Sequence, residues 1–541
     1  MKKDKDVNEI LYFREVIEKF IPKLKVKRII RERYGLELLK RKRNIKNIRR
    51  FYDISKKEEY TLDDKTWNDF DMDKVFNKLD RNYTTLGQGV LYKMLRNLIF
   101  NEEKLKNINK KIEFIKNNTR IREKLQYNLI NLGMNKKGTL LDMVQSEFKE
   151  NKNKYYIYTF LGKILPIILF LITIYHYKFG VSLFGLLVVN LYIYEKEKLQ
   201  IPTHGILYLE QMMRCSKKIT HIKEEILEEE ISELKTINKR LKKLNGIIKI
   251  TMINNIIGGV FEIISVIFLL KEAAFYKAIP YINKNKKEIL NLYEVIGKID
   301  TYVSIANFKT GLQGSYVEPI FNNDLSLEIE EGYHILLEKG VPNSIHIKDK
   351  GVILTGTNMS GKSTFLRMVG INIILAQSFY FVLAKRYKGA FLNVVSSINP
   401  SDDLSEGKSF YLSEAESLLR VIKALEKDYP VFCPIDEIFR GTNPIERIAA
   451  SAEILKYINE RNSISIVSTH DRELIDILGD DYNFYYFSES VNSNGLSFDY
   501  KLKKGTSNTR NAIRLLEFMG YDKDIIKKAY IRAENIDKEQ G

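Results

Sequence analysis

A glycine-rich segment at residues 356–364 constrains the fold of this chain more than any other feature. It reads GTNMSGKST, follows the apolar residues 352–354 and precedes an apolar, helix-periodic segment over 365–376. This order predicts a strand, a phosphate-binding loop and a helix, because the spacing matches G-x-x-x-x-G-K-[ST] at every required position. The predicted nucleotide-binding residues are Gly356, Thr357, Asn358, Met359, Ser360, Gly361, Lys362, Ser363 and Thr364.

The residue types in this loop have a chemical explanation. Gly356 and Gly361 allow the backbone to turn until successive N–H groups point at phosphate oxygens, and the positive end of the following helix dipole lies at the same place. Lys362 is expected to reach the β- and γ-phosphates, and the Ser363 hydroxyl is expected to bind Mg²⁺. The segment therefore predicts a nucleoside triphosphate with Mg²⁺ as its ligand.

A second apolar segment, residues 431–435, ends in two acids, Asp436 and Glu437. A phosphate loop needs a metal-holding acid at the end of a neighbouring strand, so Asp436 is expected to hold Mg²⁺ through water. Glu437 is expected to orient or deprotonate the attacking water. Pro434 is unusual inside such a strand because it cannot donate to a ladder. The other interpretation of the two acids is an ordinary surface pair after a strand.

A third apolar segment, residues 464–467, leads into Ser468, Thr469 and His470. A histidine at the C-terminal edge of a parallel strand faces the ligand crevice, so His470 is expected to sense the γ-phosphate through a hydrogen bond. The alternative is a histidine that is simply satisfied at the surface or in the core. Residues 402–410, DDLSEGKSF, are by themselves a weak glycine and serine turn.

Length and charge limit the classes of protein that remain. A chain of 541 residues is too long for one core and indicates three or four domains. The net charge of +18 favours polyanionic partners such as nucleic acid or acidic lipid, although a solvated, lysine-rich surface is the alternative. The two cysteines, Cys215 and Cys433, are far apart, which excludes a disulfide framework and suits a reducing cytosol. The N-terminus has no apolar stretch, so no secretory signal is expected.

Two apolar stretches, residues 155–177 and 179–194, are the candidates for membrane contact. The first is long enough to cross about 30 Å of hydrocarbon, and the second is marginal. Lysines flank the pair and only Lys178 lies between them, which predicts a hairpin with both ends on the cytoplasmic side. The alternative is a buried helical hairpin in a cytoplasmic protein, for which Lys163 argues. The flanking lysines are Lys149, Lys152, Lys154, Lys196 and Lys198.

Four segments together are similar to the ATPase domain of the DNA mismatch-repair MutS family. Weaker similarity covers the segments just before this domain, its closing helices and the start of the family's helical core. The four matches are TGTNMSGKST at 355–364, DDLSEGKSF at 402–410, DEIFRGTN at 436–443 and STH at 468–470, and the weaker ones are 332–334, 341–344, 503–529 and 79–87.

The resemblance implies a homodimeric ATPase with composite ATP sites. Ser409 would complete the partner's site in trans, and Asn358 would help to read the γ-phosphate. Nucleotide state would move long helical levers that open or close on DNA.

Three departures accompany the match. The tripeptide at 13–15 is Phe-Arg-Glu but lacks the glycine-led loop of the family's mismatch reader, so no mismatch-recognition domain is expected. The apolar hairpin stands where the levers would carry a DNA clamp. Ser360 and Phe439 replace residues that are usually glycine.

The sequence therefore predicts an α+β protein in which a mainly helical core and lever domain precedes an α/β ATPase domain. The expected activity is Mg²⁺-ATP hydrolysis coupled to binding of plain, mismatched or branched DNA at the cytoplasmic face of the membrane. The alternative is a membrane-bound, ATP-driven switch that acts on a protein partner. Glu437, Lys362, His470 and Ser409 are the expected catalytic residues, and Ser363 and Asp436 the metal ligands. The predicted segments are 1–60 (basic helical), 61–150 (core, first part), 151–200 (hairpin), 201–315 (levers and core, second part) and 316–541 (ATPase domain).

Overall fold

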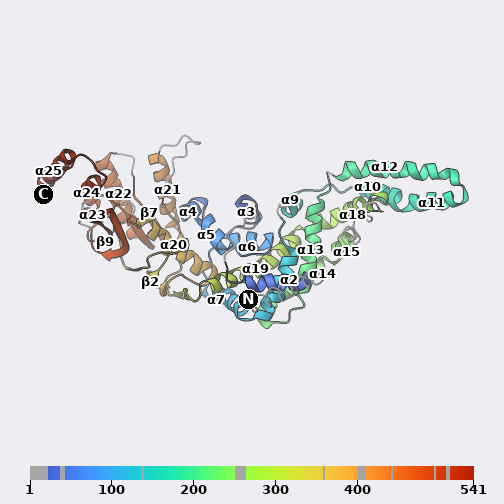
Figure 1. The fold of residues 1–541 in the computed structure, drawn as a ribbon, viewed down its shortest axis with the longest axis horizontal. Helices are drawn as coiled ribbons and strands as arrows, with labels where there is room; N and C mark the ends of the chain where they lie inside the picture. Colours follow the sequence, from blue (N-terminus) through green and yellow to red (C-terminus); the bar gives the residue numbers. More distant parts are fainter. Residues whose placement is uncertain are drawn as a thin grey trace, which may run out of the picture. The chain divides into compact units, whose positions relative to one another are not determined.

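The fold is taken from a computed structural model, in which the chain divides into two compact units (Figure 1). The first unit comprises residues 1–56, 79–93 and 110–311, and the second comprises residues 57–78, 94–109 and 312–541. The helical first unit and the mixed second unit confirm the predicted α+β class. The structure describes residues 22–36, 43–135, 139–198, 200–249, 264–357, 360–398, 410–439, 443–492, 495–506 and 512–540.

The described part of the first unit consists of helices. The helical period of the apolar residues over 102–117 predicts a helix, which is α7 (Glu102–Asn117) and ends in this unit. The sequence also predicts a helix over 286–308, which is part of α19 (Lys286–Gly311), and a buried core helix over 256–270, which lies partly outside the described residues. The other helices are α2 (Pro22–Glu32), α3 (Ile45–Ile54), α6 (Thr85–Arg96), α8 (Thr119–Leu132), α9 (Thr139–Gln145), α10 (Lys152–Thr159), α11 (Leu165–Tyr175), α12 (Gly180–Lys198), α13 (Thr203–Ile219), α14 (Glu228–Arg240), α15 (Lys242–Lys249) and α18 (Leu270–Lys284), with short turns at Phe160–Ile164, Tyr177–Phe179 and Glu225–Leu227.

A buried carboxylate joins the two ends of this helical unit. Asp300 of α19 is 0% exposed and accepts hydrogen bonds from Tyr83 N (3.1 Å), Thr84 N (2.8 Å) and Thr84 Oγ1 (2.7 Å) at the start of α6. A Cβ atom at Gly87 would overlap the Asp300 side chain, so this close approach requires glycine. Burial raises the pKa of Asp300 to about 7, against the opposing hydrogen bond from Thr84.

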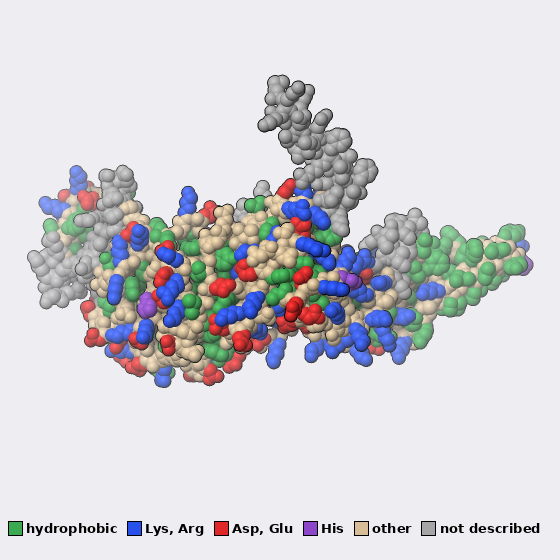
Figure 2. Space-filling model, turned by 90° about the horizontal axis from the view of Figure 1, so that it is seen from below, with side chains coloured by type: hydrophobic (Ala, Val, Ile, Leu, Met, Phe, Trp, Pro, Cys, Tyr) green, Lys and Arg blue, Asp and Glu red, His purple; other side chains and the backbone are tan. Residues whose placement is uncertain are grey.

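The apolar stretches form a helical hairpin that extends beyond the other helices of the first unit (Figure 1). The two arms run from Lys152 to Tyr175 and from Tyr177 to Lys198 and are 17% and 11% buried over their most apolar windows. Figure 2 shows their hydrophobic side chains gathered on the surface, and Lys163 is exposed with them. In the described structure the two arms are therefore not buried in a helical core.

A polar cluster fixes the base of the hairpin to α18. Glu197, which is 1% exposed, accepts hydrogen bonds from Lys154 Nζ (2.7 Å), Tyr158 OH (2.7 Å) and Tyr276 OH (2.6 Å). Further along the hairpin, the side-chain amide of Asn190 donates to the carbonyl of Ile267 at 2.6 Å. The two arms are thus joined at their polar ends around Glu197, and Asn190 adds a polar contact from within the second apolar stretch.

The second unit contains two sheets in its described residues. One has the strand order β1–β5–β2–β3, and the other has the order β10–β9–β4–β8–β7–β6. Neighbours from β9 to β6 pair in parallel, and β10 pairs with β9 antiparallel. The strands are β1 (Ile320–Phe321), β2 (Ser326–Gly332), β3 (Asn343–Lys348), β4 (Gly351–Thr355), β5 (Arg386–Gly389), β6 (Asn393–Val394), β7 (Val431–Asp436), β8 (Ser463–Ser468), β9 (Tyr482–Asn492) and β10 (Gly495–Lys504).

Helices cover both faces of the larger sheet, which explains why the residues of its central strands β4, β7 and β8 are almost all buried. α20 (Lys362–Phe379) contacts β7 and β8, whereas α21 (Phe410–Ala424), α22 (Pro444–Asn459) and α23 (Arg472–Ile477) share one hydrophobic core with the other face. Pro434 lies inside β7, where its carbonyl accepts from Ser397 N at 2.9 Å. Its missing N–H faces the edge of the sheet beside β6, and the hydrogen bonds of Ser397 and Asp436 continue the pairing beyond it. The remaining helices are α24 (Ala512–Phe518) and α25 (Lys523–Gln540).

Two segments from the N-terminal part of the chain complete the second unit. Phe70, just after α4 (Asp64–Asp69), packs against Gly370 of α20, where a Cβ atom would overlap the ring. Arg96 is 1% exposed and stacks on Trp67 at 4.2 Å. Asp69 accepts from Ser396 Oγ at 2.7 Å. Residues 61–150, predicted as the first part of the helical core, thus contribute α4 and most of α5 (Met72–Leu79) to the second unit. The division of the chain into five domains stays a prediction.

We expect Asp300 to make the stability of the first unit depend on pH. Because its pKa is about 7 when folded and about 3.9 when unfolded, the folded state holds the extra proton between these values. This contribution is full below pH 4 and is lost as pH rises toward 7, by at most about 1.4 kcal/mol per pH unit. Urea unfolding followed by circular dichroism should show a flatter pH dependence for Asp300→Asn than for the wild type. The matched control is Asp142→Asn, an exposed aspartate, which should keep the wild-type slope.

Candidate functional site

Three parallel strands end at one edge of the larger sheet and bring the predicted site residues together. In the register, Leu354 of β4 and Asp436 of β7 both pair with Ser468 of β8. The segments after these three strands therefore start side by side, although they are far apart in the sequence. This is the carboxyl edge of the sheet, where ligands bind in α/β folds.

The glycine loop turns as its sequence predicts. Gly356 and Gly361 have φ angles of +135° and +109°, a region that favours glycine. A Cβ atom at Gly356 would lie 2.7 Å from the carbonyl oxygen of Phe487, so the loop also needs glycine for space. Lys362, the first residue of α20, is buried and places its Nζ 2.7 Å from Gly356 O and 3.0 Å from Thr357 O. The lysine ammonium thus lies within the curve of the loop, where phosphates bind in such sites.

A buried carboxylate connects the loop helix to the neighbouring strands. Asp436 is 3% exposed, and its Oδ2 accepts from the Ser363 hydroxyl at 2.5 Å. Its other oxygen accepts from the Ser468 hydroxyl. A hydroxyl and a carboxylate are the oxygen ligands that Mg²⁺ prefers beside substrate phosphates. The donor set therefore fits the predicted metal, with Ser363 and Asp436 adjacent as required.

Glu437 and His470 form a pair beside Lys362. His470 Nε2 lies 2.9 Å from Glu437 Oε1 and 3.4 Å from Lys362 Nζ. The Glu437 N–H contacts the carbonyl of Ser468 at 3.1 Å, which fixes the backbone beyond β7. Glu437 has a φ of +58°, a left-handed conformation that costs about 1–3 kcal/mol for a non-glycine residue and occurs most often at functional sites. The two acids are therefore not an ordinary surface pair, because their carboxylates face the loop elements.

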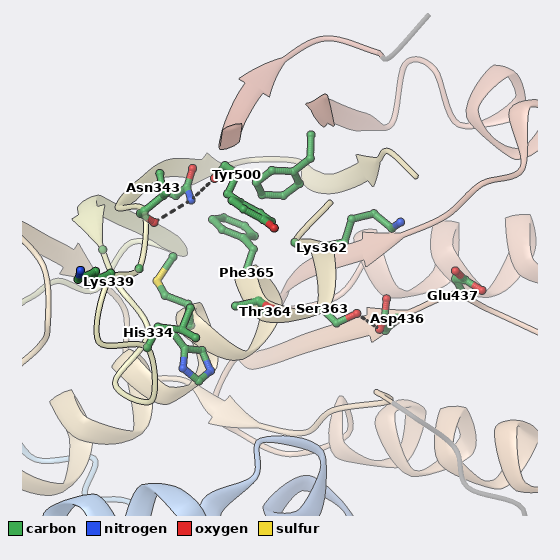
Figure 3. Close-up of a pocket in the computed structure, with 17 residues that line it drawn as sticks. His334, Lys339, Asn343, Lys362, Ser363, Thr364, Phe365, Asp436, Glu437 and Tyr500 are labelled. Atoms are coloured by element: carbon green, nitrogen blue, oxygen red, sulfur yellow. Dashed lines mark hydrogen bonds between the residues drawn. The ribbon is translucent and has the colours of Figure 1, made fainter. Parts of the chain in front are cut away.

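A cavity of about 650 Å³ adjoins the loop (Figure 3). Tyr500 lines it, and a Cβ atom at Gly361 would lie 3.4 Å from the Tyr500 ring. The side chain of Asn343 holds this part of β10 in place, since it donates to Tyr500 O at 2.9 Å and accepts from Leu502 N at 2.7 Å. The size is typical of small-molecule sites, and an aromatic ring beside the phosphate loop suits a nucleobase. The lining also includes His334, Leu337, Lys339, Ser363, Thr364, Phe365, Met368, Asp436, Glu437 and Phe487.

His334 adds a neutral polar group to this cavity. Burial, together with the nearby Arg367 guanidinium, lowers the pKa of His334 to about 4. Its Nδ1 accepts from Leu336 N at 3.2 Å, so the proton of the neutral ring is on Nε2. An uncharged imidazole can exchange hydrogen bonds with a heterocyclic base without adding a charge to the cavity.

Most of the predicted site residues are therefore found together at one edge of the sheet. Asn358, Met359 and Ser409 lie outside the described residues, so their expected roles stay predictions. Ser360 is buried and its hydroxyl has no partner among the described residues. Sequence reasoning gave no role to Ser468, whose position at the end of a strand beside Asp436 could have indicated one. It missed Tyr500 because a register shift in β10 places that ring, and no motif marks it.

Comparison with known proteins agrees with this geometry. A family model described as MutS domain V matches residues 352–537. Residues 352–537 belong to the MutS family. The match contains β4, the glycine loop, β7 and β8, so the MutS ATPase domain is the part of the chain that holds the site.

The similarity to individual MutS proteins covers about half of the chain. The DNA mismatch repair protein MutS of Thermus aquaticus is 26% identical over 263 residues, which are 48% of this chain and 32% of that protein. MutS of Halothermothrix orenii is 28% identical over 275 residues (48% and 30%). Endonuclease MutS2 of Staphylococcus aureus strain Newman is 28% identical over 272 residues (48% and 33%). The chain spans about a third of the length of these relatives.

One departure from the usual MutS sequence has a visible structural consequence. Phe439 stands where the resemblance leads one to expect glycine, and its φ of +56° lies in the region that favours glycine. The phenyl ring is 4% exposed, lies 5.2 Å from the ring of Tyr411 and belongs to the hydrophobic core beneath α21. Packing of the ring thus offsets the backbone strain at this position.

We expect Tyr500→Ala to weaken ATP binding by roughly tenfold, because stacking of a base on an aromatic ring contributes about 1–3 kcal/mol. Binding of pyrophosphate, which has no base, should stay unchanged. Isothermal titration calorimetry with both ligands measures the difference. Tyr500→Phe keeps the ring and is the matched control. Equal ATP affinity in the alanine variant and the wild type would show that the base lies elsewhere.

Proposed function

We propose that this chain is a Mg²⁺-dependent ATPase of the MutS type that couples its nucleotide state to the binding of DNA. The observation that carries the proposal is the meeting of Lys362, Ser363 and Asp436, with Ser363 Oγ 2.5 Å from the carboxylate. These residues come from the start of one helix, α20, and the end of one strand, β7, and they supply a cation, a hydroxyl and an acid. A phosphate loop of this composition with a neighbouring acid is the arrangement that binds Mg²⁺ and a triphosphate.

In the proposed reaction, water attacks the γ-phosphate in line with the leaving oxygen. Lys362 and the loop N–H groups balance the charge on the phosphates, and a Mg²⁺ ion held by Ser363 and Asp436 would add positive charge at the same place. Glu437 orients the water and takes its proton. His470, 2.9 Å from Glu437, holds that carboxylate and lies close enough to Lys362 to sense the γ-phosphate.

The proposal includes a homodimer, in which Ser409 of each copy completes the site of the other. Its support is the DDLSEGKSF motif and the resemblance of residues 503–529 to the closing helices of MutS proteins. Exposed apolar residues on the described C-terminal helices, Phe518, Met519, Ile525 and Ile531, favour a covered surface there.

DNA is the proposed partner for two reasons. Two of the relatives reported above are named as DNA mismatch repair proteins. The net charge of +18 also favours a phosphate backbone as ligand, in a manner that depends on salt and carries no base sequence information. Recognition of a mismatch is not part of the proposal, because no residue of the chain argues for it.

The exposed hairpin favours attachment to the cytoplasmic face of a membrane. Its arms of 24 and 22 residues are about 36 Å and 33 Å long at 1.5 Å per residue, enough for about 30 Å of hydrocarbon. Large apolar side chains along both arms are exposed, which is unusual for a surface in water. The polar cluster around Glu197 lies at the base, where the arms would leave the lipid. The same hairpin supports the second candidate function, a membrane-bound ATP-driven switch that acts on a protein partner.

We expect Glu437→Gln to bind ATP within about twofold of the wild type and to lose at least about 100-fold in kcat, because a positioned base contributes roughly 10²–10⁴-fold. Lys362→Ala should weaken both binding and turnover, since its charge contacts the phosphates before and during the reaction. Phosphate release and equilibrium binding separate the two effects. Glu453→Gln, on the exposed side of α22, is the matched control. Unchanged hydrolysis in Glu437→Gln would remove this residue from the mechanism.

We expect the wild type to remain with the membrane fraction after a carbonate wash. The double variant Ile168→Lys and Leu171→Lys should move to the soluble fraction, because each mid-span lysine costs about 2.5–3.5 kcal/mol. The control is Leu36→Lys with Ile320→Lys, which adds the same charge at exposed apolar residues outside the hairpin. A wild type found wholly in the soluble fraction would exclude the membrane hairpin.

A further inference from the structure

The first unit contains a second cavity, which we call the basic groove. It has a volume of about 1060 Å³ and lies between α2, α8 and the end of α13. It belongs to the helical unit and shares no residue with the cavity beside the glycine loop. Its lining residues are Lys27, Arg31, Thr119, Arg120, Glu123, Lys124, Tyr127, Asn128, Lys218 and His221.

The charge of the basic groove is strongly positive. Five of its ten lining residues are lysine or arginine, and Glu123 is the one acid among them. Arg31 already donates to both oxygens of that acid, from Nε to Oε1 and from Nη2 to Oε2 at 3.0 Å. Four cations, Lys27, Arg120, Lys124 and Lys218, form no ion pair with any residue that the structure describes. Their charges are therefore available to a ligand.

These cations are not one solvated helix face, because they come from three helices and surround one hollow. Like charges around a concave site focus a positive potential and raise the local concentration of anions. The first turn of α8 contributes Thr119 and Arg120, so the positive end of that helix dipole lies at the same place.

The size and lining of the basic groove favour a chain of phosphates over a single anion. Its volume exceeds what one phosphate needs, and its cations are distributed over three helices. Tyr127 is half-buried and Asn128 is 6% exposed, which places an aromatic ring and an amide among the cations. Cations that follow a backbone, with an aromatic ring for stacking, are the features of single-stranded nucleic-acid sites.

A lipid headgroup fits the position of the basic groove less well. α13 begins at Thr203, shortly after the hairpin ends at Lys198. Lys218 lies 15 residues further along the same helix, about 22 Å at 1.5 Å per residue. The cations are thus at the end of α13 that is remote from the hairpin, while a headgroup site would be expected beside the hairpin base.

We propose that the basic groove binds a run of phosphate groups, as presented by the backbone of a single nucleic-acid strand. Lys27, Arg120, Lys124 and Lys218 contact the phosphates, and Tyr127 stacks with a base. The assignment extends the DNA-binding half of the proposed function to a defined surface, and it does not depend on ATP hydrolysis. An inorganic polyphosphate chain presents the same chemistry without bases and separates the two sources.

The test uses the full chain with Arg120→Glu and Lys124→Glu together. The matched control is Lys217→Glu with Lys235→Glu, exposed lysines of α13 and α14 that do not line the groove and change the net charge equally. Fluorescence anisotropy measures binding of a 20-nucleotide DNA strand and its duplex between 50 and 200 mM salt (roughly the range over which phosphate contacts are lost). Inorganic polyphosphate serves as competitor, and vesicles of phosphatidylglycerol form a separate arm.

We expect the groove variant to bind the single strand at least about tenfold more weakly than the control variant. The slope of log affinity against log salt should fall by about 1.4, since each lost contact to a single strand removes about 0.7. Polyphosphate should displace the strand from the control variant. Basal ATP hydrolysis should be equal in both variants, which shows that both are folded.

Three results would overturn the assignment. Equal DNA binding by the groove variant and the control refutes the groove and leaves the proposed DNA partner intact. A loss confined to vesicle binding identifies a lipid site instead. A wild type that hydrolyses ATP but binds neither DNA nor polyphosphate contradicts both the groove and the DNA half of the proposed function.

Discussion

The carboxylate of Asp436 is the contact on which the candidate site depends. It lies at the end of a central parallel strand, is almost fully buried, and accepts hydrogen bonds from hydroxyls on both sides, Ser363 and Ser468. A buried carboxylate without partners would be costly, so the contact requires α20, β7 and β8 to meet at this point. The same requirement brings Lys362, Glu437 and His470 within reach of one another. The site therefore forms where α20, β7 and β8 pack around the carboxylate of Asp436.

The second unit depends equally on a segment that comes from far away in the sequence. Asp69 accepts from Ser396 Oγ and from Ile398 N at 2.9 Å, and its carbonyl accepts from Arg367 of α20 at 2.7 Å. Burial raises the pKa of Asp69 to about 6, and the hydrogen bonds from Ile398 and Ser396 oppose that rise. Asp69 therefore connects α20 to residues 396–398, which follow β6 in the sequence. The chain passes from this segment into the first unit at Leu79.

The first unit carries two surfaces of opposite chemistry. The hairpin exposes apolar side chains along both arms, and the basic groove gathers unpaired cations at the far end of α13. Exposed hydrocarbon is unfavourable in water, and exposed cations around a hollow attract anions. A lipid bilayer is the proposed contact of the first surface, and a phosphate chain is the proposed contact of the second. Both proposed contacts, with lipid and with phosphate groups, therefore belong to the helical unit and not to the ATPase domain.

Much of the second unit could be predicted from the sequence because its signals are local. The glycines at 356 and 361 need a left-handed backbone, the apolar runs need two covered faces, and acids after a strand need a sheet edge. The helix over 102–117 is equally predictable, because its apolar residues recur at the helical period of 3.6 residues. What could not be predicted involves partners distant in sequence. No period shows that Phe70 packs on α20, and nothing near Tyr500 shows that Asn343 holds it beside the loop.

The sequence by itself determined the chemistry of the phosphate loop, its acids and the length of the apolar hairpin, because these depend on residue type and on spacing within one segment. Tertiary structure alone decided that Ser468 shares Asp436, that α4 belongs to the second unit, and that cations from α2, α8 and α13 surround one groove. Each of these requires residues more than 30 positions apart to approach within a few ångströms, and such approaches follow from the packing of whole elements.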